Sequence, residues 1–195
     1  MINRLKEYRI ILASRSLRRR ELIKCLDIPF EIAEDFDSDE SYPPDMPPDD
    51  VAGFLAGKKS DACPRKLGEK EILVTADTMV KCGNELIGKP ENSRDAKEML
   101  GKLSGRRHEV ITGVCMRTLG QRKTFSVSSH VFFADLPPED IEYYVENYSP
   151  LDKAGAYGIQ EWIGYTGIER IEGSHYNVMG LPVSRLWKEL KSLTV

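Results

Sequence analysis

The 195-residue sequence predicts an α/β fold of the mixed α+β kind, with a single mixed sheet flanked by helices. Short apolar runs alternate along the chain with segments of helical periodicity, as in folds built around one sheet. No internal repeat and no linker divides the chain, so residues 1–195 are predicted to form one domain. A hydrophobic content of 41% supplies the core that a domain of this length needs.

The first elements are predicted to be a strand, a helix and a second strand. The Ile-rich run YRIILAS ends in small polar residues, which is typical of a buried strand. Ser14 or Ser16 would cap the helix that follows, and Pro29 would stop it. The segment PFEIAEDF predicts the second strand.

An acidic, proline-rich loop, DSDESYPPDMPPDD, leads into the next predicted helix. This helix is expected to begin near Asp49 or Asp50 and to carry Val51, Phe54 and Leu55 on one side.

The segment EILVTADTMVKCGNELIGKP predicts a buried strand that ends at Asp77, followed by a hairpin turning at Gly83-Asn84. The next helix, in NSRDAKEMLGKLSG, would be capped by Asn92 or Ser93. HEVITGVCM and TFSVSSHVFFA predict two further strands. LPPEDIEYYVENY predicts a helix with prolines at its entry, and VSRLWKELKSL an amphipathic closing helix.

Charge and composition exclude several classes of function. The chain has 28 basic and 31 acidic residues, a net charge of −3, whereas proteins that bind duplex nucleic acid carry a basic excess. The first apolar run is too short for a signal peptide, and no stretch is long enough to span a membrane. The cysteines form no CxxC pair, so we expect a cytoplasmic protein with reduced thiols. The histidines have no zinc-site spacing, so we expect no zinc site.

Two groups of residues suggest anion and metal chemistry. The segment from Ser14 to Arg20 offers helix-start amides and arginines, which together suit phosphate, although ordinary surface charge explains them equally well. Asp77 could orient water or a divalent metal, or could simply cap a turn. Lys89 could return near Asp77 across the hairpin, and Glu40 ends an acidic stretch; both also fit ordinary solvated side chains.

The segment PLDKAGAYGIQ is rich in small residues, which allow the backbone to approach a flat ligand closely. Gln160 at its end carries both a donor and an acceptor. A tightly packed strand crossing is the alternative explanation. IEGSHYNVMGLP similarly resembles a turn bracketed by glycines.

Six segments together resemble the Maf family of nucleotide pyrophosphatases: LASRSLRRREL, ADT, GKP, LSGRRHEVITGV, PLDKAGAYGIQ and IEGSHYNVMGLP. They occur in the family's order over residues 10–187. The resemblance implies a Maf/ITPase-like fold with a cleft between two lobes. It also implies hydrolysis of nucleoside triphosphates to monophosphate and pyrophosphate, a divalent metal (Mg²⁺ or Mn²⁺), a cytoplasmic setting, a homodimer, and links to septum formation, cell-division arrest and nucleotide-pool cleansing.

The resemblance also assigns roles to individual residues. Asp77 matches the proton acceptor and, with Glu40, the acids that would hold metal. The residues matched to phosphate binding are Ser14, Arg19, Lys59 and Lys89. Those matched to substrate choice are Arg18, Thr78 and Gln160.

Within the family, DKAGAYGIQ is similar to the branch that acts on dTTP and UTP. Leu17 stands where the family usually has proline; proline suits the first helical position without being required there, so we expect retained activity. Two rival functions remain open: a nucleotide-binding division regulator with vestigial hydrolysis, and an enzyme directed at methylated GTP or other modified nucleotides.

Overall fold

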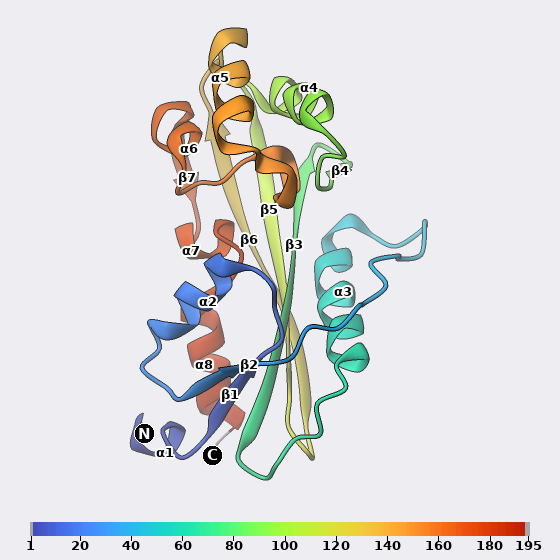
Figure 1. Ribbon diagram of the computed structural model, residues 1–195, viewed down its shortest axis with the longest axis vertical. Helices are drawn as coiled ribbons and strands as arrows, with labels where there is room; N and C mark the ends of the chain where they lie inside the picture. The colour runs from blue at the N-terminus through green and yellow to red at the C-terminus, as the bar shows by residue number, and fades with distance from the viewer. Residues whose placement is uncertain (1, 194–195) are drawn as a thin grey trace. The chain divides into compact units, whose positions relative to one another are not determined.

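The strands of the computed structural model, which describes residues 2–193, form one mixed sheet in the order β2-β1-β3-β5-β6-β7, with β4 paired to β3 (Figure 1). The strands are β1 (Arg9–Leu12), β2 (Phe30–Ile32), β3 (Glu71–Cys82), β4 (Glu85–Ile87), β5 (Arg107–Arg117), β6 (Arg122–Phe133) and β7 (Ile168–Glu172). This architecture confirms the predicted mixed α/β fold with a single mixed sheet.

The helices fall between these strands, as the alternation in the sequence predicts. They are α1 (Ile2–Leu5), α2 (Leu17–Lys24), α3 (Pro48–Ala62), α4 (Ser93–Leu103), α5 (Pro138–Tyr148), α6 (Trp162–Gly167), α7 (His175–Val178) and α8 (Val183–Leu193). Two short 3₁₀ turns, η1 (Pro150–Asp152) and η2 (Ala154–Ala156), follow α5. Within residues 2–193, no helix has the length and apolar character needed to cross a membrane.

Contacts between residues group the chain into two compact units. The first unit comprises Met1–Asp77, Thr112–Val127 and Gly180–Val195, and the second comprises Thr78–Ile111 and Ser128–Met179. The long strands β3, β5 and β6 each contribute residues to both units. Neither unit is a continuous segment.

In the first unit, β1 lies between β2 and β3 and is parallel to both. Leu12 is level with Ile32 on one side and with Val74 on the other, so the three strands share one carboxyl edge. In open α/β sheets, ligands bind outside the carboxyl ends of the strands. The loop after β1, the loop after β2 and the continuation of β3 all begin at this edge.

Helix α3 is seated closely against the sheet of the first unit. Thr75 on β3 donates a hydrogen bond from Oγ1 to the carbonyl oxygen of Ala56 at 2.7 Å. A Cβ at Gly113 on β5 would lie 2.2 Å from the backbone of Ala52, so only glycine permits this approach. Figure 1 shows α3 on one side of these strands and α2 and α8 on the other.

In the second unit, α4 and α5 pack on a core that includes Leu100, Leu103 and Tyr144, all fully buried. The hairpin predicted at Gly83-Asn84 is confirmed, because β4 pairs antiparallel with β3 and Cys82 is level with Glu85. Asn92 caps α4 by accepting a hydrogen bond from Asp95 N, as one of the two predicted caps. Strand β7 pairs antiparallel with β6.

The prediction that the strand ends at Asp77 is wrong. β3 continues from Glu71 to Cys82, and beyond Asp77 it gains a new partner in β4, where Val80 is level with Ile87. Strand pairing therefore overrides the low β propensity of aspartate.

One further boundary and the burial of one side chain differ from the prediction. Helix α2 ends at Lys24, ahead of Pro29, because the chain turns through a positive φ of 52° at Asp27. Helix α3 begins at Pro48, one residue before the predicted start near Asp49 or Asp50, and proline suits the first helical position. Phe54 is 38% exposed, whereas its neighbours Val51 and Leu55 are buried as expected.

The segment PLDKAGAYGIQ contains the two 3₁₀ turns and no strand, so the alternative of a strand crossing is wrong. The chain turns there through positive φ angles of 70° at Gly155 and 58° at Ala156.

Candidate active site

The loop between β1 and α2 holds the predicted phosphate-binding segment. Ser16, not Ser14, caps α2 by accepting a hydrogen bond from Arg19 N at 3.4 Å. The Ser14 side chain accepts a hydrogen bond from Ser16 N at 3.2 Å, and the Arg20 guanidinium donates to the Ser14 carbonyl at 3.3 Å. The loop is thus ordered by its own polar groups at a helix start, where anions are favoured.

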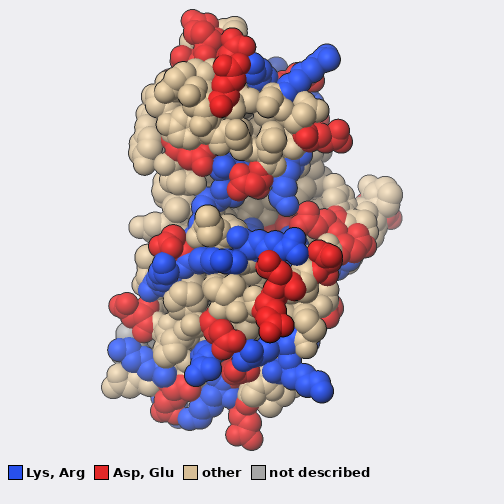
Figure 2. Space-filling view, in the orientation of Figure 1, with Lys and Arg blue, Asp and Glu red and all other residues tan. Residues whose placement is uncertain are grey.

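Basic side chains gather on the face drawn in Figure 2, in a band at the height of α2, with acidic side chains beside them. Arg19 belongs to this helix and donates from Nε to the carbonyl oxygen of Gly180 at 2.7 Å. Partial burial lowers the pKa of Arg19, whereas the carboxylates of Asp77 and Glu40 raise it. The guanidinium keeps its charge in any case and lies within electrostatic reach of both acids.

Lys59 brings the two predicted acids together. Its Nζ lies 2.5 Å from Asp77 Oδ1 and 2.8 Å from Glu40 Oε1. Helix α3 carries the lysine, β3 carries Asp77, and the loop after β2 carries Glu40. Asp77 and Thr75 lie two positions apart on β3 and both bond to α3, as side chains on one face of a strand can.

The two carboxylates differ in exposure. The Asp77 side chain is 11% exposed and that of Lys59 is 15% exposed, whereas that of Glu40 is 50% exposed. Asp77 is therefore the more firmly held acid, on a strand that lies within the sheet, and Glu40 comes from a loop.

Two cations tie down the acidic loop that carries Glu40. Lys58 donates to Asp39 Oδ2 and to the carbonyl oxygen of Ser41, both at 2.7 Å. These contacts lower the pKa of Asp39, mainly through the hydrogen bonds from Lys58 and Ser41. Arg15 reaches Asp37 Oδ1 at 3.2 Å from the loop after β1. The loop is thus held by Arg15 at Asp37 and by Lys58 at Asp39 and Ser41, just before and just after Glu40.

The donor set suits a hard divalent cation that shares its shell with substrate. Glu40 and Asp77 direct carboxylate oxygens at one ammonium group, so their oxygens already converge on a positive charge. Among residues 2–193, no three His, Cys, Asp or Glu residues cluster as a metal site. Mg²⁺ is typically held by one or two carboxylates together with phosphates and water, which fits two acids and a triphosphate.

Of the other predicted residues, Arg18 lies on α2 in the first unit, and Thr78, Lys89 and Gln160 lie in the second unit. Thr78 follows Asp77 directly on β3 and is half-buried. Because β4 pairs antiparallel with β3, the chain runs back alongside β3 after the hairpin. Lys89 comes two residues after Ile87, which is the last residue of β4.

Gln160 lies at the end of the glycine-rich loop in the second unit. Its Oε1 is buried and accepts no hydrogen bond from the described residues. Gly155 N donates to the carbonyl oxygen of Gly88 at 2.9 Å, which joins this loop to the segment that carries Lys89. A buried polar atom without a partner is costly, and a ligand that donates to it removes that cost.

Several residues that hold this loop were not predicted from the sequence. The Tyr157 hydroxyl and His108 Nε2 are 2.7 Å apart, and both residues are buried. Burial lowers the pKa of His108 to about 4, so its ring is neutral at pH 7. Lys153, which lies in the same loop and pairs with Glu161, is also buried, with 7% of its surface exposed. Only the density of Tyr, Lys and Asp around a glycine-rich segment could have signalled them.

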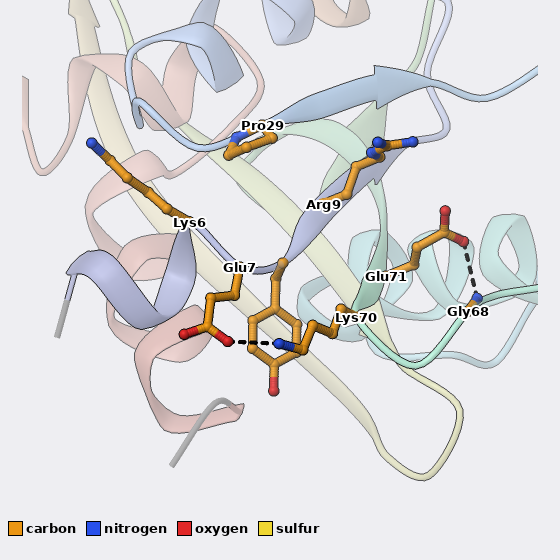
Figure 3. A pocket seen from close by; sticks show the side chains of 8 residues that line it. Lys6, Glu7, Arg9, Pro29, Gly68, Lys70 and Glu71 are labelled. Atoms are coloured by element: carbon orange, nitrogen blue, oxygen red, sulfur yellow. Dashed lines mark hydrogen bonds and ion pairs between the residues drawn. The ribbon is translucent and has the colours of Figure 1, made fainter.

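A separate open pocket of about 390 Å³ lies at the amino end of the parallel strands, away from these acids (Figure 3). Two of its charged side chains already have ionic partners, because Lys70 contacts Glu7 at 2.6 Å and Glu71 contacts Arg65 at 2.9 Å (Figure 3 shows the first of these pairs). None of the predicted site residues lines it.

Comparison with known proteins identifies close relatives over the full length of the chain. A dTTP/UTP pyrophosphatase from Phocaeicola vulgatus is 47% identical over 193 residues, which cover 99% of this chain and all of the relative. One from Parabacteroides distasonis is 50% identical over 191 residues, covering 98% of this chain and 99% of the relative. One from Porphyromonas gingivalis is 49% identical, covering 98% and 97% respectively.

A solved HAM1 protein from Coxiella burnetii aligns with 95% of this chain at 14% identity and a TM-score of 0.46, covering 99% of its own chain. The family described as Maf-like protein matches residues 9–193. That match spans the site loop, both acids and Gln160, and the chain belongs to the Maf family.

Proposed function

We propose that this protein hydrolyses nucleoside triphosphates, with dTTP and UTP preferred, to the monophosphate and pyrophosphate. The observation that carries the proposal is the meeting of Asp77 and Glu40 on Lys59, with Arg19 within electrostatic reach of both acids. The activity named for the full-length relatives agrees with it. Acidic and cationic side chains in this arrangement suit a reaction in which water attacks a polyanion.

The cations of the site would bind the triphosphate. Arg19 and Lys59 stand at the same carboxyl edge, and Ser14 adds a hydroxyl beside the helix start. Lys89 would complete the phosphate contacts from the β3–β4 hairpin. Arginine and lysine both bind phosphate, arginine through a planar fork and lysine as a point charge.

Asp77 would act as the general base. It would orient a water molecule and take its proton as the water oxygen bonds to the α-phosphorus. The bond from that phosphorus to the oxygen bridging to the β-phosphorus breaks, and pyrophosphate leaves. A carboxylate that is 11% exposed and fixed by Lys59 needs little reorganisation to do this.

Glu40 and Asp77 would hold the divalent metal, Mg²⁺ or Mn²⁺, together with oxygens of the triphosphate. When bound, such an ion neutralises charge that develops on the phosphate oxygens.

Base choice would rest on Gln160, Arg18 and Thr78. A uracil or thymine ring presents an N–H donor flanked by two carbonyl acceptors, and a carboxamide can pair with one of each. The buried, unpartnered Oε1 of Gln160 supports this role, since the ring N–H would supply the donor that it lacks.

The single domain over residues 1–195, inferred from the absence of a linker, stays a prediction. So do the homodimer, the cytoplasmic setting and the role in division arrest or nucleotide-pool cleansing that the family resemblance implies.

Hydrolysis of dTTP in ¹⁸O-labelled water tests the proposed chemistry. Attack at the α-phosphorus places the label in the monophosphate and leaves pyrophosphate unlabelled. Label in the pyrophosphate, or release of inorganic phosphate as the first product, would contradict the proposed reaction.

A further inference from the structure

One carboxylate fastens the loop that carries Gln160. Glu161 Oε1 lies 3.1 Å from Lys153 Nζ, and Oε2 accepts a hydrogen bond from the Tyr144 hydroxyl. The same hydroxyl accepts a hydrogen bond from Gly158 N at 3.0 Å. Glu161 therefore holds the loop directly at Lys153 and, through one hydroxyl of α5, at Gly158.

These groups are buried, so their side chains have little room to move. The Lys153 side chain is 8% exposed, that of Glu161 is 19% exposed and Tyr144 is fully buried. Lys153 also pairs with Asp152 at 2.7 Å, but that side chain is 65% exposed, so Glu161 is the more buried of its two acidic partners and the costlier one to lose. Burial, and then the bond to Glu161, raises the pKa of Tyr144, so its hydroxyl keeps the proton that it donates.

The backbone links Glu161 rigidly to its neighbour Gln160. Glu161 N donates to the carbonyl oxygen of Gly158 at 3.0 Å and so closes a turn that contains Gln160. The carbonyl oxygen of Glu161 then accepts from Gly164 N at 2.9 Å in the first turn of α6. A Cβ at Gly158 would lie 2.7 Å from Glu161 Cδ, so the side chain folds back over the turn. Any displacement of Glu161 therefore moves Gln160.

We propose that Glu161 is a positioning residue for base choice, which, held by Tyr144 and Lys153, fixes the Gln160 carboxamide where a pyrimidine would meet it. This inference rests on the proposed function, because Gln160 needs a fixed position only if it pairs with a base. Both carboxylate oxygens of Glu161 are engaged by Lys153 and Tyr144, so Glu161 would act through Gln160 and not by contacting the base.

The test compares kcat/KM for dTTP and for CTP in the full-length protein and its variants. Glu161→Gln keeps the size of the side chain but removes its charge and replaces one of the two acceptor oxygens by a donor, so the side chain can no longer accept from both Lys153 and Tyr144. Tyr144→Phe keeps the ring and removes only the bridging hydroxyl. Glu142→Gln is the matched control, because Glu142 makes an exposed pair with Lys97 at 2.8 Å on the same helix as Tyr144.

We expect Glu161→Gln and Tyr144→Phe each to lower the dTTP/CTP ratio of kcat/KM about tenfold, the scale of one mispositioned hydrogen bond. Glu142→Gln leaves the ratio unchanged. In the double variant Gln160→Ala/Glu161→Gln the ratio falls no further than in Gln160→Ala alone, since both changes remove one contact.

Two results overturn the inference while leaving the proposed function in place. One is a ratio equal to the wild type in both Glu161→Gln and Tyr144→Phe. The other is a lowered ratio in Glu142→Gln as large as that in Tyr144→Phe, which would show that the effect does not come from the contact with Glu161; an equal loss for dTTP and CTP counts as an unchanged ratio and marks a purely structural role. Wild-type protein that shows no preference for dTTP over CTP overturns the proposed base choice and this inference together. Tyr144→Phe decides the question if Glu161→Gln does not fold.

Discussion

Lys59 on α3 and Asp77 on β3 are joined by an ion pair of 2.5 Å between Nζ and Oδ1. The helix and the strand are also tied together by the hydrogen bond from Thr75 to Ala56, one helical turn before Lys59. The carboxylate is thus fixed between two rigid elements, which is the condition for a positioned general base.

Asp77→Asn is predicted to keep the fold and to lower turnover at least ~10²-fold, the scale of a general-base contribution. The substitution is nearly isosteric and removes only the charge and the basic oxygen. Rates of pyrophosphate release and the unfolding temperature should be measured together. Asp61→Asn is the control, since Asp61 lies on the surface of α3 and pairs with Arg122 at 2.6 Å. Near-wild-type turnover in Asp77→Asn would remove this residue from the mechanism.

Arg19→Ala and Lys89→Ala are each predicted to weaken triphosphate binding by about tenfold or more, because each loses a charged hydrogen bond to phosphate. Binding of the nucleoside, which has no phosphate, should be unchanged. Calorimetric titration of both ligands provides the comparison. Lys24→Ala on the same helix as Arg19 changes a residue paired with Glu21 at 2.6 Å and should alter neither affinity. Equal losses for triphosphate and nucleoside would show that the assignment is wrong.

Gly113→Ala is predicted to destabilise the protein by about 3 kcal/mol, the upper range for overpacking, because the new methyl group meets backbone that cannot move aside. That methyl would lie 2.2 Å from the Ala52 carbonyl. Gly101→Ala on α4, which meets no atom within 4 Å, should instead stabilise by about 0.5–1 kcal/mol through helix propensity. Free energies of unfolding in urea separate the two, and equal values would refute the close seating of α3.

Stability is predicted to fall as pH drops below the ordinary histidine range. Burial lowers the pKa of His108 to about 4, against 6.5 when it is exposed. Between these two pH values the unfolded chain binds a proton at this ring and the folded chain does not. Between pH 7 and pH 5 this costs about 2 kcal/mol of unfolding free energy. His108→Gln should remove that part of the pH dependence, whereas His175→Gln, at an exposed site, should not. An identical pH slope in His108→Gln and wild type would contradict the burial of a neutral ring.

Long periodic segments made most of the fold predictable. The helices α4 and α8, the cap at Asn92 and the hairpin after Cys82 follow from periodicity and turn chemistry alone. The short elements α6, α7 and β7 carry too few positions for a periodic pattern and were not predicted. The continuation of β3 past Asp77 depends on pairing with β4, which local propensity does not encode.

The site was only partly predictable for the same reason. Glu40, Lys59 and Asp77 were expected from the family resemblance, but that one ammonium joins both acids depends on how α3 is seated. The bond between Tyr144 and Glu161 joins a helix to a distant loop, and no local pattern marks either residue.

Pyrophosphate release from a panel of triphosphates is the most direct test of the proposed reaction and base preference. Purified protein with Mg²⁺ should hydrolyse dTTP and UTP well and CTP poorly. Cytosine has an amino donor in place of one carbonyl and an unprotonated ring nitrogen, so it leaves Gln160 unpaired at a cost of about 1–3 kcal/mol, roughly ten- to hundredfold. Preference for CTP or for methylated GTP would contradict the proposed base preference, and no pyrophosphate from any triphosphate would contradict the proposed reaction.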